Sequence, residues 1–341
     1  MSIFDLVTAA NVVAYWIEQN VNEQPMLGET LFPYKRELGV RLEWIKGAKN
    51  QPVGLRLSAY DSKAIRRDRQ GIEQYTTKMP FFKESMYIDE EMRQSLNTLL
   101  QTRNEALIKD IVARIFDDQI SLIKAAYVSL ERMRMELIGA GTITLSSNGQ
   151  SYSYDFGVPV SQKTSSSWAS TSADVIADIN NIVKTMRAKG TIITKAICNS
   201  SVIDKLVKNT NIKNQIYVLA GGNISSISSQ KVIEFIYSET GVKFYSYDNV
   251  YVDENGTAHK YIADNTVTFI PDGALGATHL GKTPEESDLQ TLGTAKVSVL
   301  PDGIAVATYG MEDPVNVEMK VSMVALPSFE RANEVYILDV Q

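Results

Sequence analysis

Cysteine, histidine and basic charge are all scarce in this 341-residue chain. Cys198 is the one cysteine, and His259 and His279 are the only histidines. A disulfide within one chain is therefore excluded, and a Cys/His zinc site has too few ligands. The 34 Lys and Arg residues are outnumbered by 40 Asp and Glu residues, and the resulting net charge of −6 argues against a general nucleic-acid-binding protein.

Long apolar runs are missing as well. The least polar stretch near the start, residues 6–17, is too short to span a membrane, and no Lys or Arg precedes Lys35, where a signal peptide needs a basic flank. We therefore expect no membrane segment and, with a single cysteine, a reducing cytoplasm. The composition, 44% hydrophobic and 22% charged, is that of a soluble globular protein. At about 150 residues per domain, the length predicts roughly two lobes.

The N-terminal third of the chain combines a broken arm with a basic hairpin. Helix-breaking residues interrupt the first 35 positions, so residues 1–52 are interpreted as an N-terminal arm and lead-in. Residues 53–57 alternate as a strand would, residues 61–71 are rich in charge, and residues 72–82 are β-prone, which predicts a long projecting hairpin over residues 53–84. Between positions 56 and 83, seven basic residues stand against three acidic ones. Five of them are our candidate inter-subunit contacts: Arg56, Lys63, Arg66, Arg67 and Arg69.

Such a basic segment in an acidic protein suggests contact with an acidic surface, most simply another copy of the same chain. A solvated flexible loop is the alternative that composition leaves open.

A very long helix is predicted over residues 89–138. Its apolar residues recur at steps of three and four, no Pro or Gly interrupts it, and acidic residues at 89–91 favour the positive end of the helix dipole. Gly139 and Gly141 end it. The apolar stripe weakens at residues 102–104, so a helix lying across a sheet is preferred over a coiled coil. We assign residues 85–164 to this helix and to the hairpin that follows it, whose turn is Asn148-Gly149.

The second half mixes helices and strands. After a Ser-rich linker, residues 174–189 predict a helix, 192–198 a strand, 200–207 a helix and 231–237 either a strand or a helix. Short strands follow to residue 270, with a turn at Asn255-Gly256. Residues 296–309 form a hairpin, and residues 315–325 alternate as a long strand with one buried face. We therefore predict an α+β protein in which residues 165–290 form a lobe inserted into another, and residues 291–341 return to the first lobe.

One sequence motif points to catalysis. Residues 276–283 satisfy G-x-x-x-x-G-K-[ST], the phosphate-binding loop of nucleotide hydrolases, and Asp339 follows an apolar strand as a possible magnesium ligand. However, Pro284 disfavours the helix that must start at Lys282-Thr283, and the two glutamates that follow would repel phosphate. Asp339 also lies too near the end for a surrounding sheet. We interpret the motif as structural and predict no catalytic, cofactor-binding or metal-binding residues.

The remaining candidates for chemistry are weak. Asp117 and Asp118 point about 100° apart on a helix, so they do not form an acid–base pair. Cys198 follows an apolar strand and is interpreted as an inert core thiol. Nothing in the sequence ties either histidine to a carboxylate or a nucleophile.

The order of these elements resembles the major capsid proteins of tailed phages of the Hong Kong 97 type. In that fold they are the N-terminal arm, extended loop, spine helix, β-rich peripheral domain and inserted α+β axial domain. Several stretches are similar to the lambda-like major capsid protein family, usually called capsid protein E: residues 251–256, 260–266, 275–276, 281–285, 309–310, 313–314, 326–327 and 335–340.

This resemblance implies a shell protein that is not an enzyme. It implies hexamers and pentamers that form an icosahedral phage head around double-stranded DNA without sequence-specific binding, assembled in the host cytoplasm. No long scaffolding segment precedes the arm, which suggests a separate scaffolding protein, and decoration and portal proteins are further expected partners. A bacterial nanocompartment shell is the alternative within the same class, and a nucleotide hydrolase using Lys282 is the rival outside it.

Overall fold

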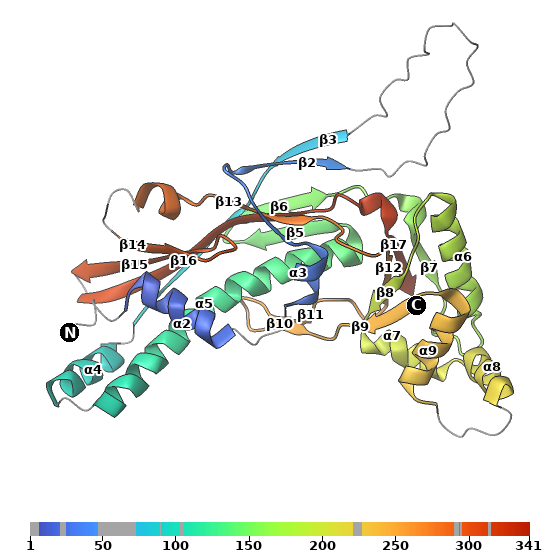
Figure 1. Cartoon of the computed structure of the whole chain (residues 1–341), viewed down its shortest axis with the longest axis horizontal. Coiled ribbons are helices and arrows are strands. Elements are labelled where there is room, and N and C mark those ends of the chain that lie inside the picture. The colour runs from blue at the N-terminus through green and yellow to red at the C-terminus, as the bar shows by residue number, and fades with distance from the viewer. Residues whose placement is uncertain are drawn as a thin grey trace, which may run out of the picture. The chain divides into compact units, whose positions relative to one another are not determined.

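The computed structural model divides the chain into two compact units, each built from stretches far apart in the sequence (Figure 1). The structure describes residues 7–20, 25–46, 73–88, 90–102, 105–220, 227–289, 293, 295–312 and 315–341. Unit 1 comprises Met1–Glu43, Thr76–Arg134 and Gly276–Ser328, and unit 2 comprises Trp44–Tyr75, Met135–Leu275 and Phe329–Gln341. The units are interleaved, whereas we expected one lobe to be inserted once into the other.

A six-stranded sheet organises unit 1. Its strands run in the order β1, β13, β16, β15 and β14, and β4 also pairs with β16. β1 is parallel to β13, and all other pairs are antiparallel. The bounds are β1 Tyr34–Arg36, β4 Phe81–Tyr87, β13 Ala277–Gly281, β14 Lys296–Val299, β15 Ala305–Glu312 and β16 Val315–Ser328.

Strand β16 is covered on both faces, although its alternating sequence predicts one buried face. The Ala9 amide donates to Thr308 Oγ1 at 3.2 Å, and Thr308 is the register partner of Met319, so the N-terminal helix meets the apolar face of β16. On the opposite face, the Ser322 hydroxyl donates to the Glu285 carboxylate at 2.8 Å. The polar residues of β16 are therefore partly satisfied inside the protein, because a second layer covers them.

Four described helices lie wholly or partly in unit 1, and the first of them contacts β14 and β15. They are α2 Ala9–Asn20, α3 Leu27–Leu31, α4 Glu90–Thr102 and α5 Glu105–Ala140. The predicted helix over residues 89–138 is therefore two helices, and α4 ends where the apolar stripe weakens. With 36 residues, α5 is about 54 Å long, and the division between the units falls within it. Gly141 ends α5 as predicted, since its φ of 73° is left-handed and its amide donates to Leu137 O at 2.8 Å.

A five-stranded mixed sheet with a helical layer organises unit 2. Its order is β7, β17, β12, β8 and β9, and the chain's last strand, β17, lies parallel to β7 and antiparallel to β12. The strand bounds are β7 Lys163–Ser166, β8 Lys195–Cys198, β9 Lys243–Ser246, β12 Thr266–Ile270 and β17 Tyr336–Val340. We expected residues 291–341 to lie together, but β14 to β16 belong to the sheet of unit 1 and β17 to that of unit 2.

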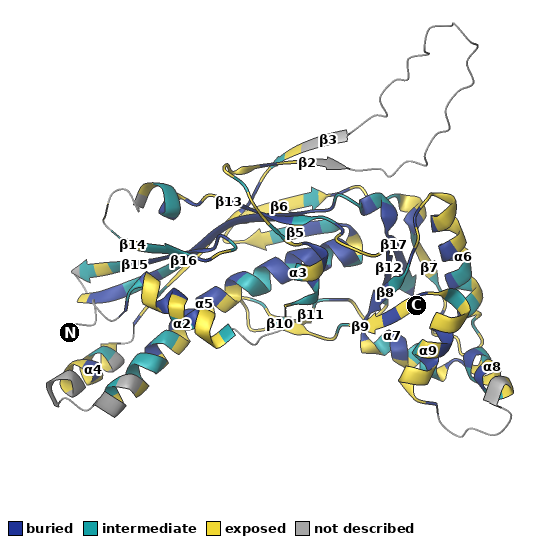
Figure 2. Ribbon diagram, viewed as in Figure 1, coloured by how far each residue is buried: buried dark blue, intermediate teal, exposed yellow. Residues whose placement is uncertain are grey.

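Four helices pack on this sheet: α6 Val175–Ala188, α7 Ser200–Lys208, α8 Thr210–Ala220 and α9 Ser229–Thr240. Three begin with a side-chain cap, in which Asp174, Asn199 and Ser228 accept from Ala177, Val202 and Lys231 amides. Residues 231–237, for which the sequence allowed either a strand or a helix, lie in helix α9. Figure 2 shows these helices buried on one side and exposed on the other, as their amphipathic sequences predict.

Two hairpins complete unit 2. β5 (Thr142–Ser147) pairs with β6 (Gln150–Asp155), and β10 (Val250–Val252) pairs with β11 (Ala258–Lys260). Asn148 and Gly149 have φ of 51° and 73°, the two positive angles that a type I′ turn requires, so the Asn-Gly prediction is confirmed. The short helical turns in the described part of the chain are η1 Val160–Gln162, η2 Glu285–Leu289 and η3 Ala332–Glu334.

A separate two-stranded hairpin stem is formed by β2 (Arg41–Lys46) and β3 (Glu73–Lys78). We predicted its first strand at residues 53–57, which lie outside the described residues. The stem pairs an earlier stretch, and the Met79 amide extends it by donating to Val40 O at 2.9 Å. The sequence between β2 and β3 contains the predicted basic tip.

Candidate functional site

The motif at residues 276–283 is a strand, not a phosphate-binding loop. Residues 277–281 form β13, which is hydrogen-bonded to β1 on one side and to β16 on the other. A side chain on Gly276 would collide with the backbone oxygen of Ser328, and one on Gly281 would come within 2.5 Å of Gly39 O. Both glycines are thus explained by close backbone packing, and the amides of β13 are committed to the sheet.

The other residues of the motif also have structural roles. Thr283 is fully buried, and its hydroxyl accepts the Glu286 amide at 3.3 Å, so it caps the turn η2. Lys282 is exposed, and Asp339 lies in β17 of the other unit's sheet. The geometry therefore supports the structural interpretation of the motif.

Each histidine has a carboxylate partner that the sequence did not reveal. His279 is buried between Glu37, at 2.9 Å from Nδ1, and Ser328, at 3.0 Å from Nε2. His259 contacts Asp253 at 2.9 Å in the exposed hairpin β10–β11. Glu37 is 242 residues from His279 in the sequence, so no local pattern could have found the pair.

No reactive nucleophile or metal cluster accompanies these histidines in the part of the chain that the structure describes. No group of three or more His, Cys, Asp or Glu side chains there could hold a metal ion. Burial raises the pKa of the Cys198 thiol to about 12, which keeps it protonated and inert, as predicted. Asp117 accepts the Tyr15 hydroxyl at 2.9 Å, which is a structural contact.

A buried ion pair on α5 holds the N-terminal segment of unit 1. Glu131 and Arg134, with 0% and 1% of their side chains exposed, lie one helical turn apart, 3.5 Å from Oε2 to Nη1. Glu131 Oε1 accepts the Gly28 amide of α3 at 2.9 Å. Arg134 Nε donates to Thr278 Oγ1 of β13 at 2.8 Å, and its guanidinium lies 4.7 Å from the centre of the Tyr34 ring. One pair of side chains thus joins α3, β1 and β13 to α5.

Further carboxyl and phenol groups surround this pair. Burial raises the pKa of Asp302, which lies in the turn between β14 and β15, although its hydrogen bond with Tyr127 opposes the shift. Burial also raises the pKa of Glu29; Arg134 opposes this shift, and the negative charges of Asp302 and Glu131 add to it. For Tyr34, burial raises the pKa to about 12. These groups therefore form a crowded, poorly hydrated junction.

A second buried carboxylate fixes the turn η2 to the opposite face of the sheet. Glu285 is 2.7 Å from Lys320 Nζ and accepts the Ser322 hydroxyl, both on β16. Burial alone raises the pKa of Glu285, but the hydrogen bonds from Lys320 and Ser322 outweigh it and lower the pKa below its usual value. Glu285, one of the two glutamates that argued against a phosphate-binding loop, therefore holds η2 on β16.

The predicted inter-subunit residues, Arg56, Lys63, Arg66, Arg67 and Arg69, lie outside the described residues. Only the stem that leads to them, β2–β3, is described (Figure 1). Their role therefore stays a prediction.

Comparison with protein families decides what kind of protein this is. The family model described as phage major capsid protein E matches residues 8–340, which is nearly the whole chain. The chain belongs to the phage major capsid protein E family. A comparison of the sequence with curated proteins found no match.

Solved structures show the same fold. A proposed prophage capsid protein from E. coli CFT073 has a TM-score of 0.63 at 12% identity, covering 98% of this chain and 99% of the other. A phage-related protein from Bordetella bronchiseptica RB50 has a TM-score of 0.57 at 11% identity, covering 97% and 96%. At such low identity the likeness concerns the fold, which is the tailed-phage capsid fold expected from the order of elements. The protein is a phage major capsid protein, with its place in the capsid of the virion.

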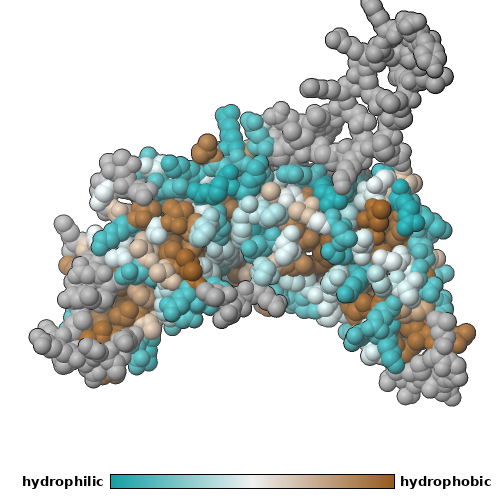
Figure 3. Space-filling model, in the orientation of Figure 1, coloured by the Kyte–Doolittle hydropathy of each residue, from teal (hydrophilic) through white to brown (hydrophobic). Residues whose placement is uncertain are grey.

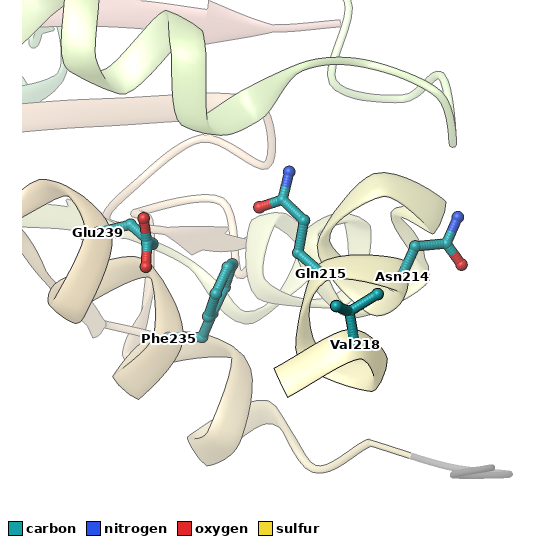
Figure 4. Close-up of a pocket in the computed structure, with 5 residues that line it drawn as sticks. All are labelled: Asn214, Gln215, Val218, Phe235 and Glu239. Atoms are coloured by element: carbon teal, nitrogen blue, oxygen red, sulfur yellow. The ribbon is translucent and has the colours of Figure 1, made fainter. Parts of the chain in front are cut away.

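One pocket among the described residues has a lining that does not suggest catalysis. It lies between α8 and α9 of unit 2, has a volume of about 390 Å³, and is lined by Asn214, Gln215, Val218, Phe235 and Glu239 (Figure 4). A single carboxylate beside two amides provides neither an acid–base pair nor a nucleophile. Figure 3 shows apolar and polar side chains interspersed on the face of the molecule that it presents. Within the described residues, no helix is both long enough and apolar enough to cross a membrane.

Sequence reasoning missed the buried ion pair of Glu131 and Arg134. The available signal was that both lie beside Leu130 and Met133, inside the apolar stripe of α5, at the i and i+3 positions of an ion pair. Charged residues on the buried face of a helix need partners. Glu131 pairs with Arg134 and also accepts the Gly28 amide of the N-terminal segment.

Proposed function

We propose that this protein assembles into hexamers and pentamers that close into an icosahedral shell around double-stranded phage DNA. The family match over residues 8–340 is the observation that carries this proposal. Self-assembly of one chain into rings needs heterologous contacts, in which different surfaces of neighbouring copies meet.

Within this shell, α5 is proposed as the spine helix, the sheet of unit 1 as the core of the peripheral domain, and the sheet of unit 2 as the core of the axial domain. Residues 1–52 would form the N-terminal arm and a lead-in that includes β2, and the hairpin that the stem β2–β3 begins would form the extended loop. The ranges expected from the sequence, 53–84, 85–164, 165–290 and 291–341, approximate these parts, since the two sheets draw on interleaved stretches.

The basic segment between β2 and β3 is proposed to contact a neighbouring copy through Arg56, Lys63, Arg66, Arg67 and Arg69. Its support is charge: the segment is basic in a chain of net charge −6, so an acidic surface of another copy is an available partner. The same negative net charge suits a container whose wall encloses DNA without binding it tightly.

Other proteins complete the proposed assembly. A separate scaffolding protein would direct closure, a portal would occupy one vertex, and a decoration protein would bind outside, with assembly in the host cytoplasm. The protein would act by assembly alone and catalyse no reaction.

Expression of the full chain in bacteria, with and without the neighbouring structural proteins of its phage, tests this function. Sedimentation followed by nuclease treatment should yield particles, and particles from infected cells should protect double-stranded DNA. Particles that enclose an enzyme instead of DNA would indicate a nanocompartment. A strictly monomeric chain under all these conditions would contradict the proposal.

Charge reversal tests the basic segment separately. The triple variant Arg66→Glu, Arg67→Glu and Arg69→Glu should fail to assemble while keeping the circular dichroism of the wild type. The matched control is Lys184→Glu, an exposed position on α6. Normal assembly of the triple variant would show that the segment is only a solvated loop.

A further inference from the structure

Strand β4 is an edge strand of the sheet of unit 1. It pairs along its whole length with residues 318–324 of β16. β15 pairs with much of the same stretch of β16, so β4 and β15 lie on opposite sides of that strand. Within the residues that the structure describes, no further strand pairs with β4. Its outer edge is therefore a boundary of the sheet.

Two hydrogen bonds at the ends of β4 show which of its backbone groups face β16. The Ala325 amide donates to Pro80 O at 3.3 Å. At the other end, the Ile88 amide donates to Val317 O, also at 3.3 Å. Because the backbone groups of successive residues point to opposite sides of a strand, the even-numbered residues of β4 bond to β16. The residues whose N–H and C=O groups point outward are Phe81, Lys83, Ser85 and Tyr87.

The outward-facing residues of β4 are all exposed. Phe81 and Tyr87 have 42% and 53% of their surfaces accessible, and Lys83 and Ser85 are exposed between them. The edge thus presents a row of backbone donors and acceptors with an aromatic side chain at each end. A long free edge of this kind pairs readily with a strand of another chain. It therefore fits one more β-strand.

This edge is complementary to itself. In an antiparallel pair of β4 strands related by a twofold axis through Glu84, Phe81 lies opposite the partner's Tyr87, and Lys83 lies opposite the partner's Ser85. All four outward residues then pair, and each pair exchanges two backbone hydrogen bonds, about eight in all. A shift of the register by two residues leaves one of these pairs unmade. The aromatic residues at the ends also meet across the strands, which stabilises the pair further.

We propose that β4 is a pairing edge, which joins β4 of a second copy in this register and so unites the unit 1 sheets of two copies. The choice of partner rests on the proposed function, since a shell brings copies of this one chain together. Two identical surfaces related by a twofold axis form an isologous contact. This contact differs from the heterologous contacts that build the rings.

The contact is weak on its own for two reasons. Glu84 lies on the axis and opposes itself, and like charges directly opposite each other destabilise a strand pair. The seven residues of β4 span about 24 Å, and such a narrow strip buries far less than the roughly 1,200 Å² of a stable interface. The free chain is thereby kept from aggregating through this edge. Pairing is expected chiefly where other contacts of the shell hold two copies together.

Crosslinking through an introduced cysteine tests the register. In the Glu84→Cys variant the two thiols lie opposite each other in a non-hydrogen-bonded pair, where Cα atoms are about 4.5 Å apart and a disulfide can form. In the matched control Ser85→Cys, on the same exposed strand, the two thiols are diagonal neighbours about 7–8 Å apart, which is too far for an unstrained disulfide. The natural Cys198 is buried and should not take part.

The full-length variants are oxidised mildly, both as concentrated unassembled protein and as sedimented particles, and separated by non-reducing gel electrophoresis. We expect Glu84→Cys to give a covalent dimer that reduction reverses, and Ser85→Cys to give little. No dimer from Glu84→Cys in either preparation, or as much dimer from Ser85→Cys, would overturn the proposal. Particles without the crosslink would leave the shell function standing, whereas crosslinked dimers without particles would support the pairing and contradict the shell.

A second variant tests the charge on the axis without a cysteine. Glu84→Gln removes the like-charge contact, so self-association measured by sedimentation velocity at pH 7 should be about two- to fivefold tighter than in the wild type. The control Glu234→Gln, at an exposed position of α9, removes the same charge away from β4 and should leave association unchanged. Equal association of Glu84→Gln and the wild type would overturn the proposed register.

Discussion

Replacing Arg134 with Met removes the cation that balances the buried Glu131. Both side chains are essentially inaccessible, at 1% and 0% exposed, so water cannot take the place of the guanidinium. Breaking a buried pair in this way costs about 3–5 kcal/mol. Met fills most of the volume of Arg, which limits the contribution of an empty cavity. The loss should therefore arise mainly from the uncompensated carboxylate.

Native-state hydrogen exchange of α3 and of the middle of α5 measures this loss locally. A change of about 3–5 kcal/mol corresponds to exchange that is roughly 10²- to 4 × 10³-fold faster. The control Arg114→Met, at an exposed position of the same helix, should change exchange by less than about 0.5 kcal/mol.

A double variant separates charge from packing. Adding Glu131→Gln to Arg134→Met removes the buried negative charge but keeps an acceptor for the Gly28 amide. The double variant should regain most of the lost protection, because the two residues are directly coupled. If Arg134→Met behaves like Arg114→Met, or if the double variant is as damaged as the single one, the ion pair does not hold the segment.

Three further outcomes follow from the described contacts. The Glu285→Gln variant should lower thermal stability most at neutral pH: the pKa of Glu285 is depressed in the folded protein, so its stabilising effect is present above its unfolded pKa and disappears as the pH falls through the folded pKa. Equal destabilisation at pH 7 and pH 3 would contradict the anchoring role. Gly149→Val should cost about 1–2 kcal/mol of unfolding free energy because position 149 has a φ of 73°, whereas Ser151→Val in β6 should cost little. Lys282→Ala should leave both thermal stability and assembly unchanged, and titration with ATP should show no binding by either protein; binding lost in the variant would revive the nucleotide hydrolase.

Local chemistry explains which parts of the fold could be predicted. The turn at Asn148-Gly149 and the end of α5 at Gly141 were predicted because the required left-handed angles depend on one or two residues. The long strand β16 was evident from its alternation, yet its second buried face was not, because the turn η2 that covers this face comes from an earlier stretch of the chain. The phosphate-binding loop was rejected on three sequence features: Pro284, the two glutamates that follow it and the position of Asp339.

Long-range pairing explains what the sequence concealed. β17 enters the sheet of unit 2 between β7 and β12, and β1 joins β13 across more than 240 residues, so the interleaving of the units has no local signal. The pair of His279 and Glu37, which are 242 residues apart, likewise has no local signal in the sequence. The order of elements was nevertheless sufficient to suggest the capsid fold, since the family resemblance depends on that order rather than on any catalytic motif.

Imaging of the purified, assembled protein by electron cryomicroscopy tests the central claim most directly. The account predicts closed icosahedral particles built from six- and five-membered rings of this chain, with α5 and both sheets recognisable in every subunit. A protein that stays monomeric at high concentration and with its phage partners present, or that forms only irregular aggregates, would contradict it.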